Sequence, residues 1–159
     1  MSQFHVEKRR AEAELTLSSG HRLRGIFFLA GSCFRHSGPE RIADLLNAQD
    51  GFFPFETARD PAGTALINRA HVVSVRLLEQ PDEPQLDPGY LVAPERQVVM
   101  LLSNGATLRG AVRVYRPEGR DRLSDYAQQS SETFRYVESA DGTFVVNCAH
   151  IVNLRESES

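Results

Sequence analysis

The chain has 159 residues, of which 41% are hydrophobic and 25% are charged, and its formal net charge is −3 at pH 7. This composition is that of an ordinary soluble globular protein, with no apolar run near the roughly 20 residues of a membrane-spanning helix. A slightly acidic chain also lacks the clustered Lys and Arg of a large nonspecific nucleic-acid surface. We therefore expect a cytoplasmic protein with no membrane partner, because the N-terminus lacks the apolar stretch of a signal peptide.

Two blocks of sequence occur twice, in the same order. Residues 18–25 return as 103–110, and each copy ends in Leu-Arg-Gly. Residues 68–76 return as 147–155, and each copy begins with Asn-x-Ala-His. Two blocks that recur in one order indicate an internal duplication of a structural unit.

Each unit is predicted to open with a β-hairpin. In the first copy, residues 13–17 alternate apolar and polar side chains, reach Ser-Gly, and resume at residues 22–29. In the second copy, residues 98–102 and 107–115 flank Asn104-Gly105. Asn-Gly between two strand-like runs is the strongest short signal for a hairpin.

Glycine ends the Leu-Arg-Gly triplet of both copies, at Gly25 and Gly110, inside a strand-like run. A glycine within a strand usually marks a sharp bend or a close approach of another backbone. We therefore expect both strands to bend at these positions, as the strands of a small barrel do.

A short helical insert is predicted next in each copy, around Asp44 and Asp125. A single carboxylate per unit is not a general acid–base pair. We expect these two aspartates to cap their helices or to pair with Arg41 and Arg122.

Three further strands complete each unit, and the last two are joined by the Asn-x-Ala-His turn. Five strands in this order predict an all-β protein of two tandem five-stranded barrels with short helical inserts, one at residues 1–78 and one at 96–159. Residues 79–95 hold four of the eight prolines, so we expect an extended, semi-rigid connector.

Two motifs of each unit resemble a known family. Leu23-Arg24-Gly25 and Leu108-Arg109-Gly110 resemble the first Sm motif, and the run from Val146 to Ile151 resembles the second. The pattern is similar to that of the Sm-like barrel of Sm and LSm proteins and of a bacterial RNA chaperone, and to SH3-like barrels in general.

The resemblance implies the fold but not the ligand. Sm-like proteins bind uridine through the loop after the second strand and through a turn near the end. Here the loop is expanded into the helical insert, and the turn reads Asn-Arg-Ala-His or Asn-Cys-Ala-His. RNA binding therefore stays an alternative function.

The repeated turns supply four candidate binding residues: Asn68, His71, Asn147 and His150. We expect them to satisfy backbone groups of tight turns, and a small-ligand sensor is the alternative. We see no repeated serine, cysteine or nearby carboxylate to complete a catalytic set. The sequence thus predicts no enzyme and no cofactor. Cys33 and Cys148 do not match in the repeat, so we expect buried thiols and no metal site.

Arg24 and Arg109 alternate with core leucines and should point outward. We expect them to pair across strands or to cover barrel surface with their stems, and a phosphate contact is the alternative. Phe28, Val99 and Leu101 are apolar at outward positions, which predicts an interface with the other barrel or with a neighbouring chain.

The leading functional hypothesis is a non-enzymatic interaction or scaffold module. Exposed edge strands accept strands from other chains, so the partner is a protein or further copies of the chain. Three chains joined in this way would build a pseudo-hexameric ring.

Overall fold

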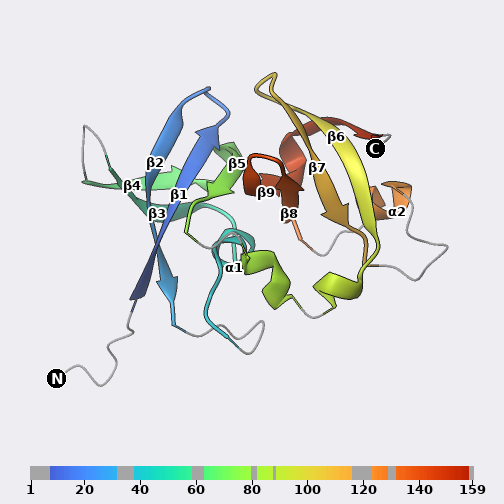
Figure 1. Cartoon of the computed structure of the whole chain (residues 1–159). Helices are drawn as coiled ribbons and strands as arrows, with labels where there is room; N and C mark the ends of the chain where they lie inside the picture. The colour runs from blue at the N-terminus through green and yellow to red at the C-terminus, as the bar shows by residue number, and fades with distance from the viewer. Residues whose placement is uncertain are drawn as a thin grey trace.

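The chain folds mainly into β-strands, which confirms the all-β prediction. Its structure, a computed structural model, describes residues 8–31, 38–58, 63–79, 82–87, 89–115, 123–128 and 132–157. The strands of these residues form one antiparallel sheet in the order β10-β6-β7-β8-β9-β5-β1-β2-β3-β4. Figure 1 shows β5 and β9 side by side in the middle of the molecule.

The two halves of the chain contain equivalent elements in the same order. The first half contains β1 (Lys8–Leu17), β2 (Arg22–Ala30), α1 (Ile42–Asn47), β3 (Phe52–Thr57), β4 (Gly63–Asn68) and β5 (Val72–Leu77). The second contains β6 (Glu95–Leu102), β7 (Thr107–Arg113), α2 (Leu123–Gln128), β8 (Phe134–Ser139), β9 (Gly142–Asn147) and β10 (Ile151–Glu156). The strands are ordered β5-β1-β2-β3-β4 in one half and β10-β6-β7-β8-β9 in the other.

Both predicted hairpins are present. β1 pairs with β2 from Lys8 opposite Ala30 to Thr16 opposite Arg22, and β6 pairs with β7 over a similar length. Gly20 and Gly105 lie in the two turns with φ values of 90° and 88°. Left-handed backbone of this kind favours glycine, so the turn residues fix where each hairpin folds back.

Gly25 and Gly110 lie where another strand approaches closely, as predicted. A Cβ on Gly25 would stand 2.1 Å from the carbonyl oxygen of Glu56 in β3. A Cβ on Gly110 would stand 2.6 Å from the carbonyl oxygen of Glu138 in β8. Only glycine lets these backbones come so near, and the second strand of each half can therefore bend against the third.

Asp44 caps α1 and pairs with Arg41, as predicted. Its carboxylate accepts a hydrogen bond from the backbone N–H of Arg41 at 2.9 Å and lies 2.8 Å from the guanidinium. Arg41 also reaches Asp87 at 2.6 Å. Burial lowers the pKa of Arg41, but Asp44, Tyr136 and Asp87 together raise it above the ordinary value. Arg122 and the side chain of Asp125 lie outside the described residues.

The connector between the halves is not extended, contrary to our expectation. It contains two 3₁₀ helices, Glu83–Leu86 and Tyr90–Val92. Glu83 is buried and accepts hydrogen bonds from the backbone N–H of Ala43 and the hydroxyl of Tyr136. One carboxylate therefore ties the connector to α1 of the first half and to β8 of the second.

Two hydrophobic cores fill the molecule, one under each half. In the first core Phe27 stacks on Phe53 with ring centroids 5.4 Å apart and meets Phe55 edge to face at 5.2 Å. The second core includes Met100 and Val112. Cys148 is half-buried rather than buried as expected, and Cys33 falls outside the described residues.

No helix among the described residues has both the length and the apolar character needed to span a membrane.

Candidate interaction edges

The two halves join through β5 and β9. The paired residues of this junction are Ser74 with Val146, Val75 with Val145, and Arg76 with Phe144. A second contact runs alongside, where the side-chain amide of Asn47 in α1 exchanges two hydrogen bonds with the backbone of Phe134, at 2.9 and 2.8 Å. The junction is therefore an edge-to-edge strand pairing reinforced by a helix.

Apolar side chains cross this junction in both directions. Val73 of β5 is 0% exposed and belongs to the core of the second half. Phe134 and Val145 of the second half are buried in the core of the first. Each core is thus completed by residues from the other half.

A β-bulge directs Val73 into the neighbouring core. In the pairing of β1 with β5, Leu17 lies opposite Val72, and the adjacent residue Thr16 lies opposite Ser74. Val73 therefore has no partner in β1. An unpaired bulge residue can be turned away from the alternation of its strand. β10 has the same irregularity, because its pairing with β6 skips Val152.

Asparagines cap both Asn-x-Ala-His turns, as predicted. The side-chain oxygen of Asn68 accepts a hydrogen bond from the backbone N–H of Ala70 at 3.0 Å. Asn147 does the same for Ala149 at 3.0 Å. Local bonds of this kind replace backbone bonds that a tight turn cannot make.

Our expectation that no repeated serine accompanies the histidines was wrong. The hydroxyl of Ser18 lies 2.8 Å from Nδ1 of His71, and that of Ser103 lies 2.6 Å from Nδ1 of His150. Both serines occur in the first repeated block, a signal that could have identified them. Among the described residues neither ring contacts a carboxylate. Each Ser–His pair fastens the hairpin turn to the closing turn of its half.

One histidine also crosses the junction. Nε2 of His150 lies 2.7 Å from the carbonyl oxygen of Ala70. Because a carbonyl only accepts, Nε2 carries the proton, and Nδ1 of the neutral ring then accepts from Ser103. Within the described part of the chain, Nε2 of His71 has no such partner.

Asn147 crosses the junction as well. Its side-chain N–H donates to the carbonyl oxygen of Val72 at 3.0 Å. Asn68 uses its oxygen for its own turn, and no hydrogen bond of its N–H group is found among the described residues. Among the described residues, the N–H group of Asn68 and Nε2 of His71 therefore lack the partners that Asn147 and His150 have across the junction.

The outermost strands of the sheet, β4 and β10, carry exposed apolar side chains. Leu66 of β4 is 68% exposed, Phe52 of the adjacent strand β3 is 59% exposed, and Val152 of β10 is 64% exposed. β4 has the sequence Gly-Thr-Ala-Leu-Ile-Asn, without a charge or a proline. Edge strands usually carry charged residues or prolines, which prevent pairing with other chains. Because β4 has neither, it is an unprotected edge.

The predicted arginine sites lie on the hairpins. Arg24 pairs across strands with Glu12 at 2.7 Å, as expected for an outward residue. Arg109 is exposed at the matching place on β7. Arg24 is thus engaged by a carboxylate on the neighbouring strand.

The predicted interface residues lie away from the junction. Phe28 is half-buried on β2, with the guanidinium of Arg10 5.3 Å from its ring centre. On β6, Val99 is buried and Leu101 is 40% exposed. None of the three residues lies on β5 or β9, the strands through which the two halves pair.

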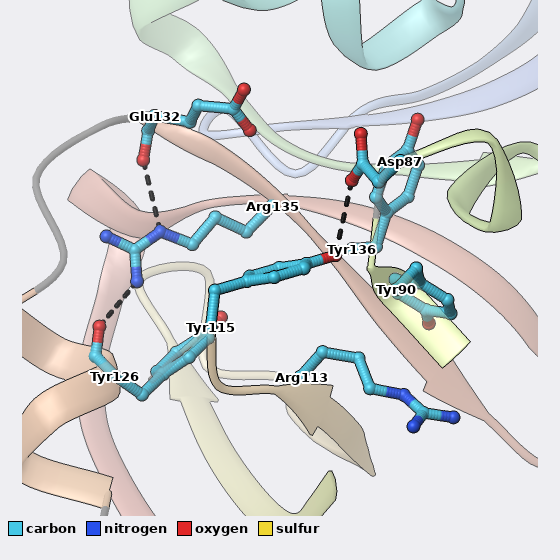
Figure 2. Close-up of a pocket in the computed structure, with 8 residues that line it drawn as sticks. All are labelled: Asp87, Tyr90, Arg113, Tyr115, Tyr126, Glu132, Arg135 and Tyr136. Atoms are coloured by element: carbon cyan, nitrogen blue, oxygen red, sulfur yellow. Dashed lines mark hydrogen bonds between the residues drawn. The ribbon is translucent and has the colours of Figure 1, made fainter. Parts of the chain in front are cut away.

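All four tyrosines of the chain line one cavity in the second half. Figure 2 shows it between the connector, β7, α2 and β8, with the Tyr115 hydroxyl directed at Asp87. Its lining residues are Asp87, Tyr90, Arg113, Tyr115, Tyr126, Glu132, Arg135 and Tyr136. We did not predict this group from the sequence, although all four tyrosines fall between residues 90 and 136.

This cavity is too small for a typical metabolite. Its volume is about 50 Å³, against roughly 300–1,000 Å³ for small-molecule sites. Arg135 donates to the backbone carbonyl of Tyr126 at 2.6 Å, and the hydroxyl of Tyr90 donates to Glu138 at 2.6 Å. The Tyr126 hydroxyl has no partner among the described residues, and the space admits water. Burial raises the pKa of every one of these tyrosines, which keeps the hydroxyls protonated at neutral pH.

A larger groove of about 380 Å³ lies at the junction, and Arg69, Ala70, Asn147 and Ala149 are among its lining residues. Both turns therefore contribute to it, but neither histidine lines it. Arg69 is held by the carbonyl oxygens of Leu45 and Phe52. The guanidinium of Arg69 is thus committed to the backbone, and Asp50 is the other charged residue of the lining.

No family model matches this chain, and neither a curated protein nor a solved structure matches it.

Proposed function

We propose that the chain is a non-enzymatic interaction module that binds other polypeptides by adding their strands to the outer edges of its sheet. In this proposal the chain consists of two tandem Sm-like or SH3-like small barrels that arose by internal duplication. The observation that carries it is the unprotected edge at β4, with Leu66 exposed on a strand that has no charge.

The matching strand orders of the two halves support the duplication. The five strands of each half have the same spatial order in the sheet, and each half has a short helix between its second and third strands. The repeated turn and the repeated Ser–His contact occupy corresponding places. Independent folding of two unrelated segments would not be expected to reproduce all of these features.

The edges themselves support strand addition as the mode of binding. An edge strand offers a row of backbone donors and acceptors, and side-chain contacts on alternate positions give specificity. On β4 and the adjacent β3, Leu66 and Phe52 provide apolar contact area. At the opposite end of the sheet Val152 of β10 does the same.

Two other candidate groups, His150 and Glu83, have structural partners, which favours a non-enzymatic role. His150 uses both ring nitrogens, one with Ser103 and one with the backbone of Ala70. Buried Glu83 holds the connector in place. These contacts tie elements of the fold together, and none leaves a nucleophile and base aligned on an open cavity.

Photo-cross-linking in the native cell tests this proposal. A photoreactive amino acid is placed at Leu66 or at Val152, and at Leu91 as a matched control, since Leu91 is 68% exposed on the connector and lies on neither edge. We expect adducts with other polypeptides at the two edge positions and not at Leu91. Equal yields at all three positions, or no adduct at the edges, would overturn the proposal.

A further inference from the structure

We propose that the outer face of β2 and β3 is a docking groove for a short segment of another polypeptide that carries a tyrosine. The inference goes beyond strand addition, because it concerns a face of the sheet and not one of its edges. Its template lies within the chain, where the connector covers the corresponding face of β7 and β8.

The docking groove has a volume of about 540 Å³ and is lined by β2, β3 and the end of α1. Apolar side chains form much of this lining, among them Phe28, Leu45, Phe52 and Pro54. Phe52 is 59% exposed, and Pro54 is exposed as well. Exposed apolar groups that gather in one place mark an interaction surface.

The docking groove and the cavity lined by the four tyrosines occupy corresponding places in the two halves. The correspondence follows from landmarks that both halves share: the glycine of Leu-Arg-Gly, the aspartate of the helix, and the phenylalanine opposite the turn asparagine. Counted from these landmarks, four lining residues match: Phe28 with Arg113, Leu45 with Tyr126, Phe53 with Arg135, and Pro54 with Tyr136.

Connector residues close the cavity of the second half. Asp87 and Tyr90 line it from the connector side, and the ring centre of Tyr90 lies 4.9 Å from the guanidinium of Arg113. Tyr90 is 4% exposed, and its hydroxyl donates to Glu138 of β8 at 2.6 Å. About 50 Å³ remains beneath this cover.

The docking groove of the first half has no such cover among the described residues. Its described lining belongs to β2, α1, β3 and the turns beside them. Where the covered face has Arg113 and Tyr136, the open face has Phe28 and Pro54. The face that lacks a cover is thus also the more apolar one, which favours a partner.

The acceptor that holds Tyr90 has a counterpart beside the groove. Glu56 corresponds to Glu138, since the backbone carbonyl of each closely faces the glycine of the neighbouring strand. The carboxylate of Glu56 pairs with Arg10 through one oxygen, and no described residue is hydrogen-bonded to the other. That second oxygen can accept a hydrogen bond from a tyrosine hydroxyl.

These contacts define the chemistry of the partner. A tyrosine in the place of Tyr90 would pack its ring against Phe28 and donate its hydroxyl to Glu56. It would also meet the guanidinium of Arg10, which lies 5.3 Å from the ring centre of Phe28, much as Tyr90 meets that of Arg113. The exposed Phe52 and Pro54 favour apolar residues beside this tyrosine.

The test uses a synthetic peptide with the sequence of residues 86–94, which includes Tyr90, and a second peptide that carries Tyr90→Phe. Each peptide is titrated into the isotope-labelled full chain, and NMR chemical shifts measure the affinity and locate the contact. We expect saturable binding with a dissociation constant of about 1 mM or tighter and with shifts at the docking groove.

Substitutions in the groove identify the binding surface. Pro54→Glu places a charge in the groove at an exposed position, and Phe52→Ser removes an exposed ring without adding charge. Both should weaken binding of the tyrosine peptide, Pro54→Glu by at least about tenfold. Val152→Glu is the matched control, since Val152 is 64% exposed on β10, and it should leave the affinity unchanged.

A double-mutant cycle tests the hydroxyl contact. The phenylalanine peptide should bind the wild-type chain about threefold more weakly than the tyrosine peptide, because it lacks one hydrogen bond. In Glu56→Ala the two peptides should bind equally. A difference of the same size in Glu56→Ala would overturn the assignment of Glu56 as the acceptor.

Two aromatic residues of the chain itself, Phe4 and Phe34, fall outside the described residues and are the alternative occupants. Phe4→Ser and Phe34→Ser in the full chain should leave the peptide affinity unchanged. A tenfold rise in affinity in either variant would overturn the proposal, since a ring of the chain itself would then compete for the groove.

No saturable binding up to about 1 mM would also overturn the proposal, and so would equal affinity of the wild type and a folded Pro54→Glu variant. Strand addition is tested separately, by cross-links at Leu66 and Val152, so loss of the docking groove would leave the proposed function standing.

Discussion

Leu66 and Val145 occupy the same place in their strands, three residues after the glycine that opens β4 and β9, yet Leu66 is 68% exposed and Val145 is 0% exposed. The difference comes from what lies beside each strand. β9 is covered by β5, and β4 is the last strand of the sheet. Leu66 is therefore exposed because β4 has no neighbouring strand on its outer side among the described residues.

The bulge residues of β5 and β10 should differ strongly in their contribution to stability. Val73→Ala removes two methyl groups from a fully buried position and should lower the free energy of unfolding by about 1–3 kcal/mol. Val152→Ala, at the corresponding exposed position, should change it by less than about 0.5 kcal/mol. Urea denaturation measures both. Equal losses at the two positions would mean that Val73 is not a core residue of the junction.

Gly25→Ala should destabilise the fold because the new methyl group would stand 2.1 Å from the carbonyl oxygen of Glu56. Relief of this clash requires β2 and β3 to move apart, and we expect a loss of about 1–3 kcal/mol in the free energy of unfolding. Arg24→Ala, one residue earlier, removes an exposed ion pair and should cost less than about 1 kcal/mol. A Gly25→Ala variant as stable as Arg24→Ala would contradict the close approach of the two strands.

Glu83→Gln should make the pH dependence of stability less steep. Burial raises the pKa of Glu83 above its ordinary value, although hydrogen bonds from Tyr136, Ile42 and Ala43 oppose the rise. Between the unfolded and the folded pKa the folded chain holds more protons, so its stability falls as pH rises through that interval. Glutamine keeps an acceptor and removes the charge.

The stability difference between Glu83→Gln and the wild type should therefore be near its minimum below about pH 4, where the carboxyl is protonated in both states. It should increase in favour of the variant as the pH rises. Thermal melts at a series of pH values measure it, with Asp82→Asn as the control at an exposed neighbour. A difference that shrinks with rising pH would show that Glu83 is stabilised as a carboxylate.

Asp44→Asn should remove most of the anchoring of α1. Arg41 is 5% exposed and Asp44 is 3% exposed, so the variant leaves a buried guanidinium with Asp87 as its remaining carboxylate contact. Breaking a buried pair from one side costs about 3 kcal/mol or more. Glu12→Gln, which breaks the exposed pair with Arg24, should cost less than about 1 kcal/mol. A chemical denaturation experiment compares the two.

The local parts of the fold were predictable from sequence because they depend on neighbouring residues. Gly20 and Gly105 locate the hairpin turns, Gly25 and Gly110 locate the close approaches, and Asn68 caps its own turn. Each of these effects acts within a few residues or through the absence of a side chain. A single sequence displays them directly.

The contacts that were missed join residues far apart in the chain. Ser18 contacts His71, and Glu83 contacts Tyr136, because the folded sheet brings these distant residues together. The junction was also hidden, because the apolar run of β5 resembles any strand covered on both faces. Val73 is covered by the other half on account of its bulge, which the hydrophobic pattern does not reveal.

The most direct measurement of the central claim is the yield of photo-cross-links at Leu66, Val152 and Leu91 in the native cell. Open sheet edges predict adducts with other polypeptides at Leu66 and Val152 and none at Leu91, which is equally exposed on the connector. Equal yields at the three positions, or no adduct at the two edges, would contradict strand addition as the mode of binding.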